Sequence, residues 1–205
     1  MNTILFKITF IPRFVRQFFY KRFNPVFFKS AGADVGNNFK VYNRVYLKLY
    51  RGGKLKIGDS FTMTSGEAIN PISRNVKACL FVNNNAILNI GNNVGMSSPC
   101  IWCNERISIG NNVKCGALVT ILDSDCHSLN FVDRQKGGTF DAANTKCKPI
   151  VIGDDVLIGC NSIILKGVSI GARTIIGAGS VVSCDIPADC IAVGNPCKVI
   201  RFINK

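Results

Sequence analysis

An aliphatic residue recurs at every sixth position through the C-terminal part of the chain, and this period restricts the possible folds more than any other feature. It matches neither the turn of an α-helix nor the simple alternation of a β-strand. It fits a short strand followed by a corner, with one aliphatic side chain of each repeat pointing inward. The repeating residues are Ile152, Ile158, Ile164, Ile170, Ile176 and Val182. Small or β-branched residues stand two positions before the last five, at Val156, Ser162, Val168, Thr174 and Ser180.

A five-residue corner motif, which begins with Val or Ile followed by Gly, recurs at residues 35–39, 57–61, 90–94, 109–113 and 152–156. Its third and fourth residues are Asn, Asp or Ser, and Gly, Asn and Asp adopt the backbone of tight corners easily. The steps from Ile90 to Ile109 and from Ile152 to Ile170 are 19 and 18 residues, so three hexapeptides make one coil. Stacked triangular coils predict a parallel β-helix whose core is buried between neighbouring coils.

The same period extends toward the N-terminus with slips of phase. We expect the following residues to point inward as well: Ile109, Cys115 and Ile121; Ile90, Met96 and Trp102; and, more weakly, Ile57, Met63 and Ile69, and Val35, Val41 and Leu47.

The first 30 residues have a different character, with six basic residues, no acidic residue and nine of the 19 aromatic residues. Four phenylalanines recur at a helical spacing, at Phe6, Phe10, Phe14 and Phe18. Pro12 and Pro25 predict two short helical pieces rather than one long helix. Such a basic, aromatic, amphipathic segment can lie in a membrane interface. It can equally pack against its own β-helix or a neighbouring subunit, and both interpretations stay open.

A long polar insertion interrupts the repeats between Ile121 and Ile152. Residues 123–148 show no inward aliphatic rhythm and contain His127, the single histidine of the chain. Polar loops that leave a rigid scaffold commonly carry function.

Composition excludes several classes of protein. One histidine rules out a site with two or more histidine ligands, and Cys100 and Cys103 lack the second pair that a zinc site needs. The net charge of +13 permits an anionic partner without identifying it, and no nucleic-acid recognition motif is present. Without an evident signal peptide or membrane span, ten cysteines are expected to be free thiols in a cytoplasmic protein, with the inner face of the membrane as an alternative location.

The segment Ile152–Arg201 resembles the hexapeptide-repeat acyltransferases, which fold as left-handed parallel β-helices. The resemblance rests on the repeats from Ile152-Gly153-Asp154-Asp155-Val156 onward and on Gly194-Asn195-Pro196-Cys197-Lys198-Val199-Ile200-Arg201. It extends over roughly residues 35–203 and is strongest toward the maltose, galactoside and polysaccharide O-acetyltransferases. It implies an all-β solenoid with an N-terminal helical segment (1–34), a left-handed β-helix (35–199) with an inserted loop (123–148), and a C-terminal tail (200–205). The handedness comes from the resemblance alone, because parallel crossovers are otherwise right-handed.

The resemblance also implies a catalytic arrangement. His127, in the stretch Leu122–Ser128, matches the family's catalytic base, and an imidazole can take the proton of an attacking hydroxyl near neutral pH. Asp123 or Asp125 would orient the imidazole, with Asp125 as the candidate. The backbone N–H of Cys160 would stabilise the developing oxyanion.

By the same resemblance, the substrates are acetyl-CoA and a sugar or glycan acceptor, no metal is used, and the enzyme is a homotrimer. The expected coenzyme-binding residues are Gly159, Cys160, Ala178, Ser183, Lys198 and Arg201. Leu157, Cys184 and the stretch Ser97–Pro99 depart from the family pattern, which leaves the acceptor open.

The sequence therefore favours an acetyl-CoA-dependent O-acetyltransferase that acts on a sugar hydroxyl, such as one of a surface polysaccharide or its precursor. Two alternatives remain, namely N-acetylation of an amino sugar and a non-catalytic solenoid that binds anions. If the protein is an O-acetyltransferase, residues 1–30 would add a peripheral membrane contact.

Overall fold

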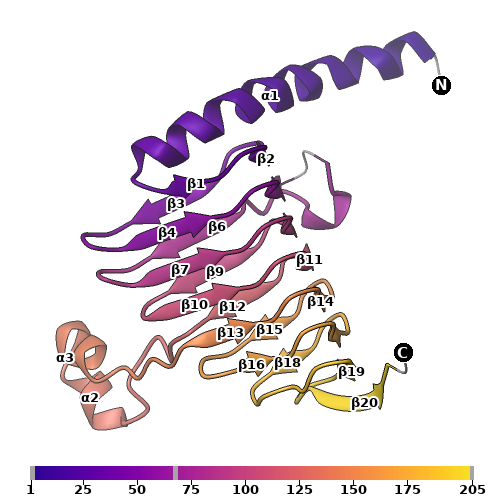
Figure 1. Ribbon diagram of the computed structural model, residues 1–205. Helices are drawn as coiled ribbons and strands as arrows, with labels where there is room; N and C mark the ends of the chain where they lie inside the picture. The colour runs from indigo at the N-terminus through magenta and orange to yellow at the C-terminus, as the bar shows by residue number, and fades with distance from the viewer. Residues whose placement is uncertain (1–2, 67–68, 204–205) are drawn as a thin grey trace.

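A triangular solenoid of short parallel strands forms the body of the protein (Figure 1). The computed structural model describes residues 3–66 and 69–203, and within helix α1 (Thr3–Ser30) it describes the side chains from Phe14 onward. Helix α1 lies across the N-terminal end of the solenoid (Figure 1). A loop with two short helices, α2 (Phe131–Gln135) and α3 (Gly138–Ala143), projects from one corner.

Three sheets make the three sides of the solenoid. The first sheet contains β1 (Asp34–Val35), β4 (Lys54–Ile57), β7 (Ile87–Ile90), β10 (Arg106–Ile109), β13 (Ile150–Ile152) and β16 (Ser169–Ile170). The second contains β2 (Lys40–Tyr42), β5 (Thr62–Thr64), β8 (Gly95–Ser97), β11 (Lys114–Ala117), β14 (Leu157–Ile158), β17 (Ile175–Ile176), β19 (Cys190–Val193) and β20 (Lys198–Phe202). The third contains β3 (Tyr46–Leu49), β6 (Cys79–Val82), β9 (Cys100–Cys103), β12 (Thr120–Leu122), β15 (Ile163–Ile164) and β18 (Val181–Val182).

Each strand pairs in parallel with the strand three positions along the chain, over most of the solenoid. Ile109 of β10 pairs with Ile152 of β13, and Ile158 of β14 pairs with Ile176 of β17. The prediction that three hexapeptides make one coil of a parallel β-helix is confirmed.

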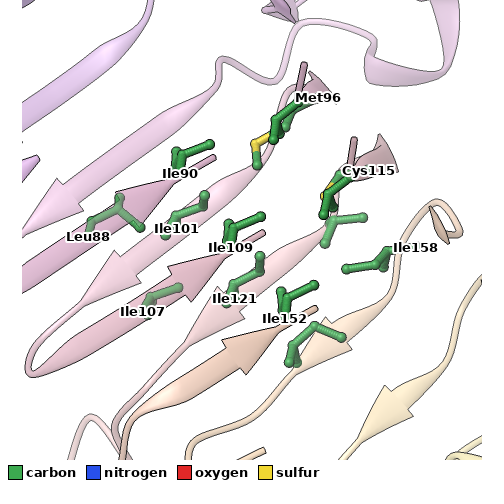
Figure 2. Close-up of a cluster of buried hydrophobic side chains, with 14 of the residues drawn as sticks. Leu88, Ile90, Met96, Ile101, Ile107, Ile109, Cys115, Ile121, Ile152 and Ile158 are labelled. Atoms are coloured by element: carbon green, nitrogen blue, oxygen red, sulfur yellow. The ribbon is translucent and has the colours of Figure 1, made fainter. Parts of the chain in front are cut away.

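The predicted inward row of the C-terminal half forms the core of the solenoid. Its six members, Ile152, Ile158, Ile164, Ile170, Ile176 and Val182, are each at most 2% exposed. Figure 2 shows how Ile90, Ile109 and Ile152 stack from coil to coil, as do Met96, Cys115 and Ile158. A column of aliphatic side chains therefore fills the interior, because each coil buries its inward residues against the next.

Two expectations about inward residues are wrong, and one bulge explains the first. Trp102 is 40% exposed, while Ile101 takes the inward position. Met96 pairs with Cys115 and Ser97 with Ala117, so β11 holds one more residue than β8, and the phase shifts after Met96. Ile69 is also exposed, because the chain leaves the solenoid there and forms a 3₁₀ turn at Pro71–Ser73 before β6.

The recurring corner motif forms one corner of the triangle, between the first and second sheets. Asn93, Asn112 and Asp155 have positive φ angles there, between 55° and 59°. At the preceding position, the Asn111 amide donates to Asp154 Oδ1 of the next coil at 2.6 Å. These side chains satisfy the corner amides that the strand ladders leave unpaired.

Helix α1 is a single helix from Thr3 to Ser30, so the prediction of two helical pieces is wrong. Its C-terminal part packs on the first coil, where the buried Phe28 ring contacts Phe39, and Asn24 Nδ2 donates to Val41 O at 2.8 Å. Such tertiary contacts stabilise a helical backbone that internal prolines alone would disfavour. The side chains of Phe6 and Phe10 lie outside the described residues, whereas those of Phe14 and Phe18 are exposed.

The C-terminal end of the solenoid closes with an antiparallel strand. Residues 200–202, expected in a tail, continue β20, which pairs with β19. Among the described helices, none is long and apolar enough to cross a bilayer.

Candidate active site

The inserted loop leaves the solenoid after β12 and returns to it at β13 (Figure 1). Its two ends lie side by side, because the Lys148 amide donates to Asp123 O at 2.9 Å and Ser124 forms an antiparallel bridge with Cys147. The buried Asp123 carboxylate accepts backbone N–H groups from Asn104 and Arg106 at 2.7 and 2.8 Å. Asp123 therefore anchors the base of the loop to the preceding coil and does not contact His127.

His127 and Asp141 form the central contact of the loop. The Nδ1 atom of His127 lies 2.6 Å from Oδ2 of Asp141, which comes from α3. The His127 side chain is 71% exposed, whereas that of Asp141 is 9% exposed. An ionised Asp141 accepts the Nδ1 proton, and this leaves Nε2 of the exposed ring as a proton acceptor.

The environment of Asp141 favours its ionised form. The hydrogen bond with His127 is the largest cause that holds the Asp141 pKa below its ordinary value of 3.8, followed by the hydrogen bond from the Ser128 amide. That amide donates to Asp141 Oδ1 at 2.6 Å. A carboxylate with both oxygens engaged orients the imidazole and stabilises its protonated form.

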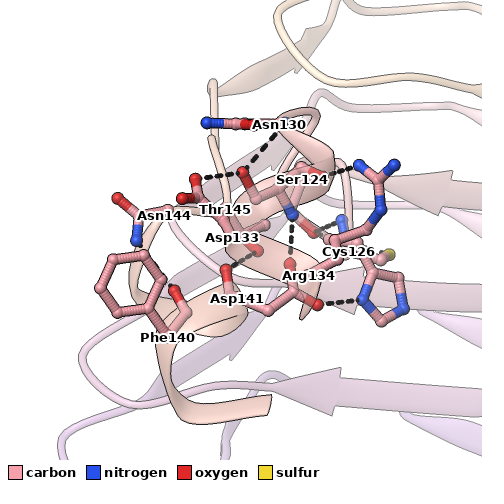
Figure 3. Close-up of polar contacts among 11 residues, drawn as sticks. Ser124, Cys126, Asn130, Asp133, Arg134, Phe140, Asp141, Asn144 and Thr145 are labelled. Atoms are coloured by element: carbon pink, nitrogen blue, oxygen red, sulfur yellow. Dashed lines mark hydrogen bonds and ion pairs between the residues drawn. The ribbon is translucent and has the colours of Figure 1, made fainter. Parts of the chain in front are cut away.

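A network of hydrogen bonds fixes this part of the loop (Figure 3). Ser128 Oγ donates to Asp133 Oδ2 at 2.8 Å, and Arg134 Nη1 donates to Ser128 O at 2.5 Å. Thr145 Oγ1 donates to the Asp141 carbonyl at 2.9 Å. Two residues of α2 thus hold Ser128, whose amide in turn bonds to Asp141 of α3.

Asp125 does not make the contact with His127 that the sequence predicted, and this expectation is corrected. Asp125 Oδ1 instead lies 3.3 Å from Lys166 Nζ, on the next coil. Its Oδ2 atom is buried and has no hydrogen-bond partner within the described part of the chain. The physical reason is the return path of the loop, which brings α3 rather than residue 125 to the imidazole.

Cys160 lies at the corner between β14 and β15, where the corner amides lack the Asn or Asp acceptors found at the corner motif. The Gly159 amide donates to Ile176 O and the Asn161 amide to Ala117 O. The Cys160 amide makes no hydrogen bond to any other described residue, and the stacked residue of the next coil is Ala178. This N–H is therefore available to a ligand.

Glycine is required at two positions of this corner. A Cβ atom at Gly116 would lie 2.6 Å from the Cys160 nitrogen, and one at Gly159 would overlap the Ala178 nitrogen. The corner thus brings together three predicted residues, Gly159, Cys160 and Ala178. It also includes Gly116, the bulge residue of β11.

The remaining predicted residues lie outside this corner. Ser183 directly follows β18 and is exposed, and Lys198 and Arg201 are exposed on β20. Arg201 pairs in register with Ile191, and Lys198 with Val193. Two cations on an exposed strand can attract phosphate groups. In the described ranges, no group of three His, Cys, Asp or Glu residues could hold a metal ion.

Sequence reasoning missed Asp141 and Gly116. Asp141 stands 14 residues from His127, and only the fold of the loop joins them. The inward step is five residues from Met96 to Ile101 and six from Cys115 to Ile121, and the longer step includes Gly116. The sequence could have revealed this difference only if Ile101, rather than Trp102, had been recognised as the inward residue.

The repeats of this chain are similar to those of known transferases. Residues 149–184 match the family described as Bacterial transferase hexapeptide (six repeats). Over 98 residues, the chain is 41% identical to the galactoside O-acetyltransferase of Escherichia coli, a match that covers 48% of this chain. The match spans 45% of that relative's length, so the chain covers about half of it.

Two solved structures extend the comparison. A hexapeptide-repeat acetyltransferase of Vibrio cholerae in complex with acetyl coenzyme A is 34% identical, with a TM-score of 0.51 over 58% of this chain and 61% of that one. A galactoside acetyltransferase in complex with coenzyme A is 27% identical, with a TM-score of 0.58 over 88% of this chain and 70% of that one.

Proposed function

We propose that this chain is a hexapeptide-repeat acyltransferase with a left-handed parallel β-helix, and that it acts as an acetyl-CoA-dependent O-acetyltransferase. The acceptor that we propose is a sugar hydroxyl, on a surface polysaccharide or its precursor. The observation that carries this proposal is the contact of His127 with Asp141 on a loop that projects from a hexapeptide solenoid. Relatives named for galactoside acetylation support the choice of a sugar hydroxyl.

In the proposed reaction, His127 acts as the general base. Its Nε2 atom takes the proton of the acceptor hydroxyl while the hydroxyl oxygen attacks the thioester carbonyl carbon. The new C–O bond forms, the C–S bond breaks, and the leaving thiolate receives the proton from the imidazolium. Asp141 stabilises the imidazolium between these two transfers.

The Cys160 amide is the proposed oxyanion donor. It would donate to the carbonyl oxygen as negative charge develops there, and a preorganised donor of this kind is commonly among the largest contributions to catalysis. The proposed coenzyme path runs along Gly159 and Ala178 toward Ser183, with Lys198 and Arg201 next to the phosphates.

We propose a homotrimer with each active site between two subunits. The hydrogen bonding of His127 is confined to its own loop, which projects away from the coils (Figure 1). A neighbouring subunit could therefore supply the Cys160 corner. Sedimentation should give about three times 22.3 kDa, and mixing His127→Ala subunits with Gly116→Leu subunits should restore activity that neither variant has alone. A fully active monomer would contradict this arrangement.

The test of the function is a screen of sugar acceptors with acetyl-CoA, read by release of the coenzyme thiol. Wild-type protein should acetylate a sugar hydroxyl, and His127→Ala should lose about 10²–10⁴-fold in kcat while retaining coenzyme A binding. Leu129→Ala, an exposed change in the same loop, is the matched control and should retain activity. Product on an amino group would instead support N-acetylation. Sugar or coenzyme binding without any transfer would support a non-catalytic solenoid.

A further inference from the structure

Three aromatic side chains form a row on the outer face of the third sheet. The ring centroids of Tyr50 and Phe81 are 5.1 Å apart, and those of Phe81 and Trp102 are 5.4 Å apart. Phe81 and Trp102 are register partners on β6 and β9. The Lys48 ammonium lies over the Tyr50 ring at 4.4 Å. This aromatic row is part of the surface, because Trp102 is 40% exposed.

A second row, of amides and a hydroxyl, runs beside the first. Asn83 Nδ2 donates to Asn104 Oδ1 at 3.0 Å, and Asn104 Nδ2 donates to Ser124 Oγ at 3.0 Å. Asn83 and Asn104 each stand two residues after a ring of the aromatic row, Phe81 and Trp102 respectively. Both asparagines are half-buried, and these hydrogen bonds hold their amides in place on the surface of the third sheet.

Both rows lead to the loop that carries His127. Trp102 pairs in register with Leu122, the last residue of β12 before the loop. Ser124 Oγ accepts the Cys126 amide at 3.3 Å, directly before His127. A molecule lying along the rows would therefore reach the catalytic loop at one end.

We propose that these two rows bind a glycan chain of several sugar units and direct it toward His127. Sugar rings present C–H faces that stack on aromatic rings and hydroxyls that bond to amides, and a surface with both features next to each other matches that chemistry. The inference rests on the proposed acetyl transfer to sugars and narrows the acceptor to an oligomeric or polymeric glycan.

Trp102 is the single tryptophan of the chain, so its fluorescence reports directly on the row. The probes are maltoheptaose, cellohexaose and an oligosialic acid, titrated into the full chain without acetyl-CoA. We expect at least one probe to change the Trp102 emission in a saturable way, and maltose to require a much higher concentration than maltoheptaose. No change with any of the three probes would overturn the proposal.

Variants test the same point by calorimetry. Trp102→Ala should weaken binding of the responding glycan by more than tenfold and Trp102→Phe by less, whereas Phe202→Ala, an exposed ring on β20, should not change it. If Trp102→Ala fails to fold, the glycan affinity of Trp102→Phe and the fluorescence titration of the wild type still test whether the aromatic row binds glycan. Unaltered glycan binding by Trp102→Ala would overturn the proposal. Dissociation of the oligomer by Trp102→Ala would also overturn it, because this sheet face would then be a contact between copies of the chain.

The two proposals fail separately. If the protein acetylates monosaccharides but does not bind the glycan probes, only the proposal that the aromatic row binds glycan is overturned. Glycan binding without acetyl transfer to any sugar would overturn the enzymatic function while the row stands.

Discussion

The Nδ1 atom of His127 lies 2.6 Å from Oδ2 of Asp141, and this contact joins the first turn of the inserted loop to helix α3. The same carboxylate accepts the Ser128 amide through its other oxygen. The imidazole is therefore oriented by the way in which the loop folds back on itself. The loop and its base are one functional unit, so changes in the loop's fold should act on the reaction.

Replacement of Asp141 by Asn should lower kcat with little change in either KM. An amide that donates to Nδ1 would favour the tautomer with the proton on Nε2, which cannot act as a base. The loss should not exceed the ~10²–10⁴-fold contribution of general-base catalysis. Asp133→Asn is the matched control, because Asp133 contacts Ser128 and not His127. Steady-state kinetics with wild-type turnover in Asp141→Asn would argue against the orienting role.

The loop should lose stability in acid. The pKa of Asp141 is lowered in the folded protein, first by the hydrogen bond with His127, so its ionised form stabilises the fold above the ordinary value of 3.8. That contribution disappears as the pH falls below 3.8 and through the lowered folded pKa. Hydrogen exchange of residues 127–143 between pH 6 and pH 3 should show a steeper loss of protection in the wild type than in Asp141→Asn. Equal slopes would contradict the linkage.

Lys198 and Arg201 should contribute to coenzyme affinity. Replacing both with Ala should raise the KM for acetyl-CoA more than the KM for the acceptor, since two cations next to phosphates are lost. Added salt should reproduce the effect in the wild type and have less effect on the variant. Lys54→Ala with Lys56→Ala, two exposed cations on β4, is the control for net charge. An unchanged KM for acetyl-CoA at low salt would refute the assignment.

The exposed part of helix α1 should bind anionic membrane surfaces. Phe14 and Phe18 are 69% and 53% exposed, and residues 1–30 carry six cations and no acid. Each cation near an anionic surface contributes on the order of 1 kcal/mol. In liposome flotation, the full chain should float with anionic but not neutral vesicles, and Phe14→Ala with Phe18→Ala should float less. Phe131→Ala, an exposed ring on α2, is the control. A full chain that ignores anionic vesicles would leave α1 as a cap of the first coil.

The sequence by itself determined the solenoid, because its information is local and repeated. Each hexapeptide specifies one inward side chain and one corner, and six copies of the pattern from Ile152 to Val182 agree with one another. The position of His127 was also readable, since an insertion stands out against a regular period. The proposed role of the corner at Cys160 came from the resemblance to the hexapeptide-repeat acyltransferases, which the same repeats carry.

Only the tertiary structure decided which groups meet across the coils. The step from Met96 to Ile101 is one residue shorter than the matching step from Cys115 to Ile121 in the next coil, and this puts Trp102 on the surface, because a slip of one residue moves side chains to the other face of a strand. Packing of Phe28 and Asn24 on the first coil accompanied one continuous helix despite two prolines. The path of the loop back to the solenoid places Asp141, and not Asp125, against His127. An aperiodic segment takes its path from long-range contacts, and no local sequence pattern encodes these.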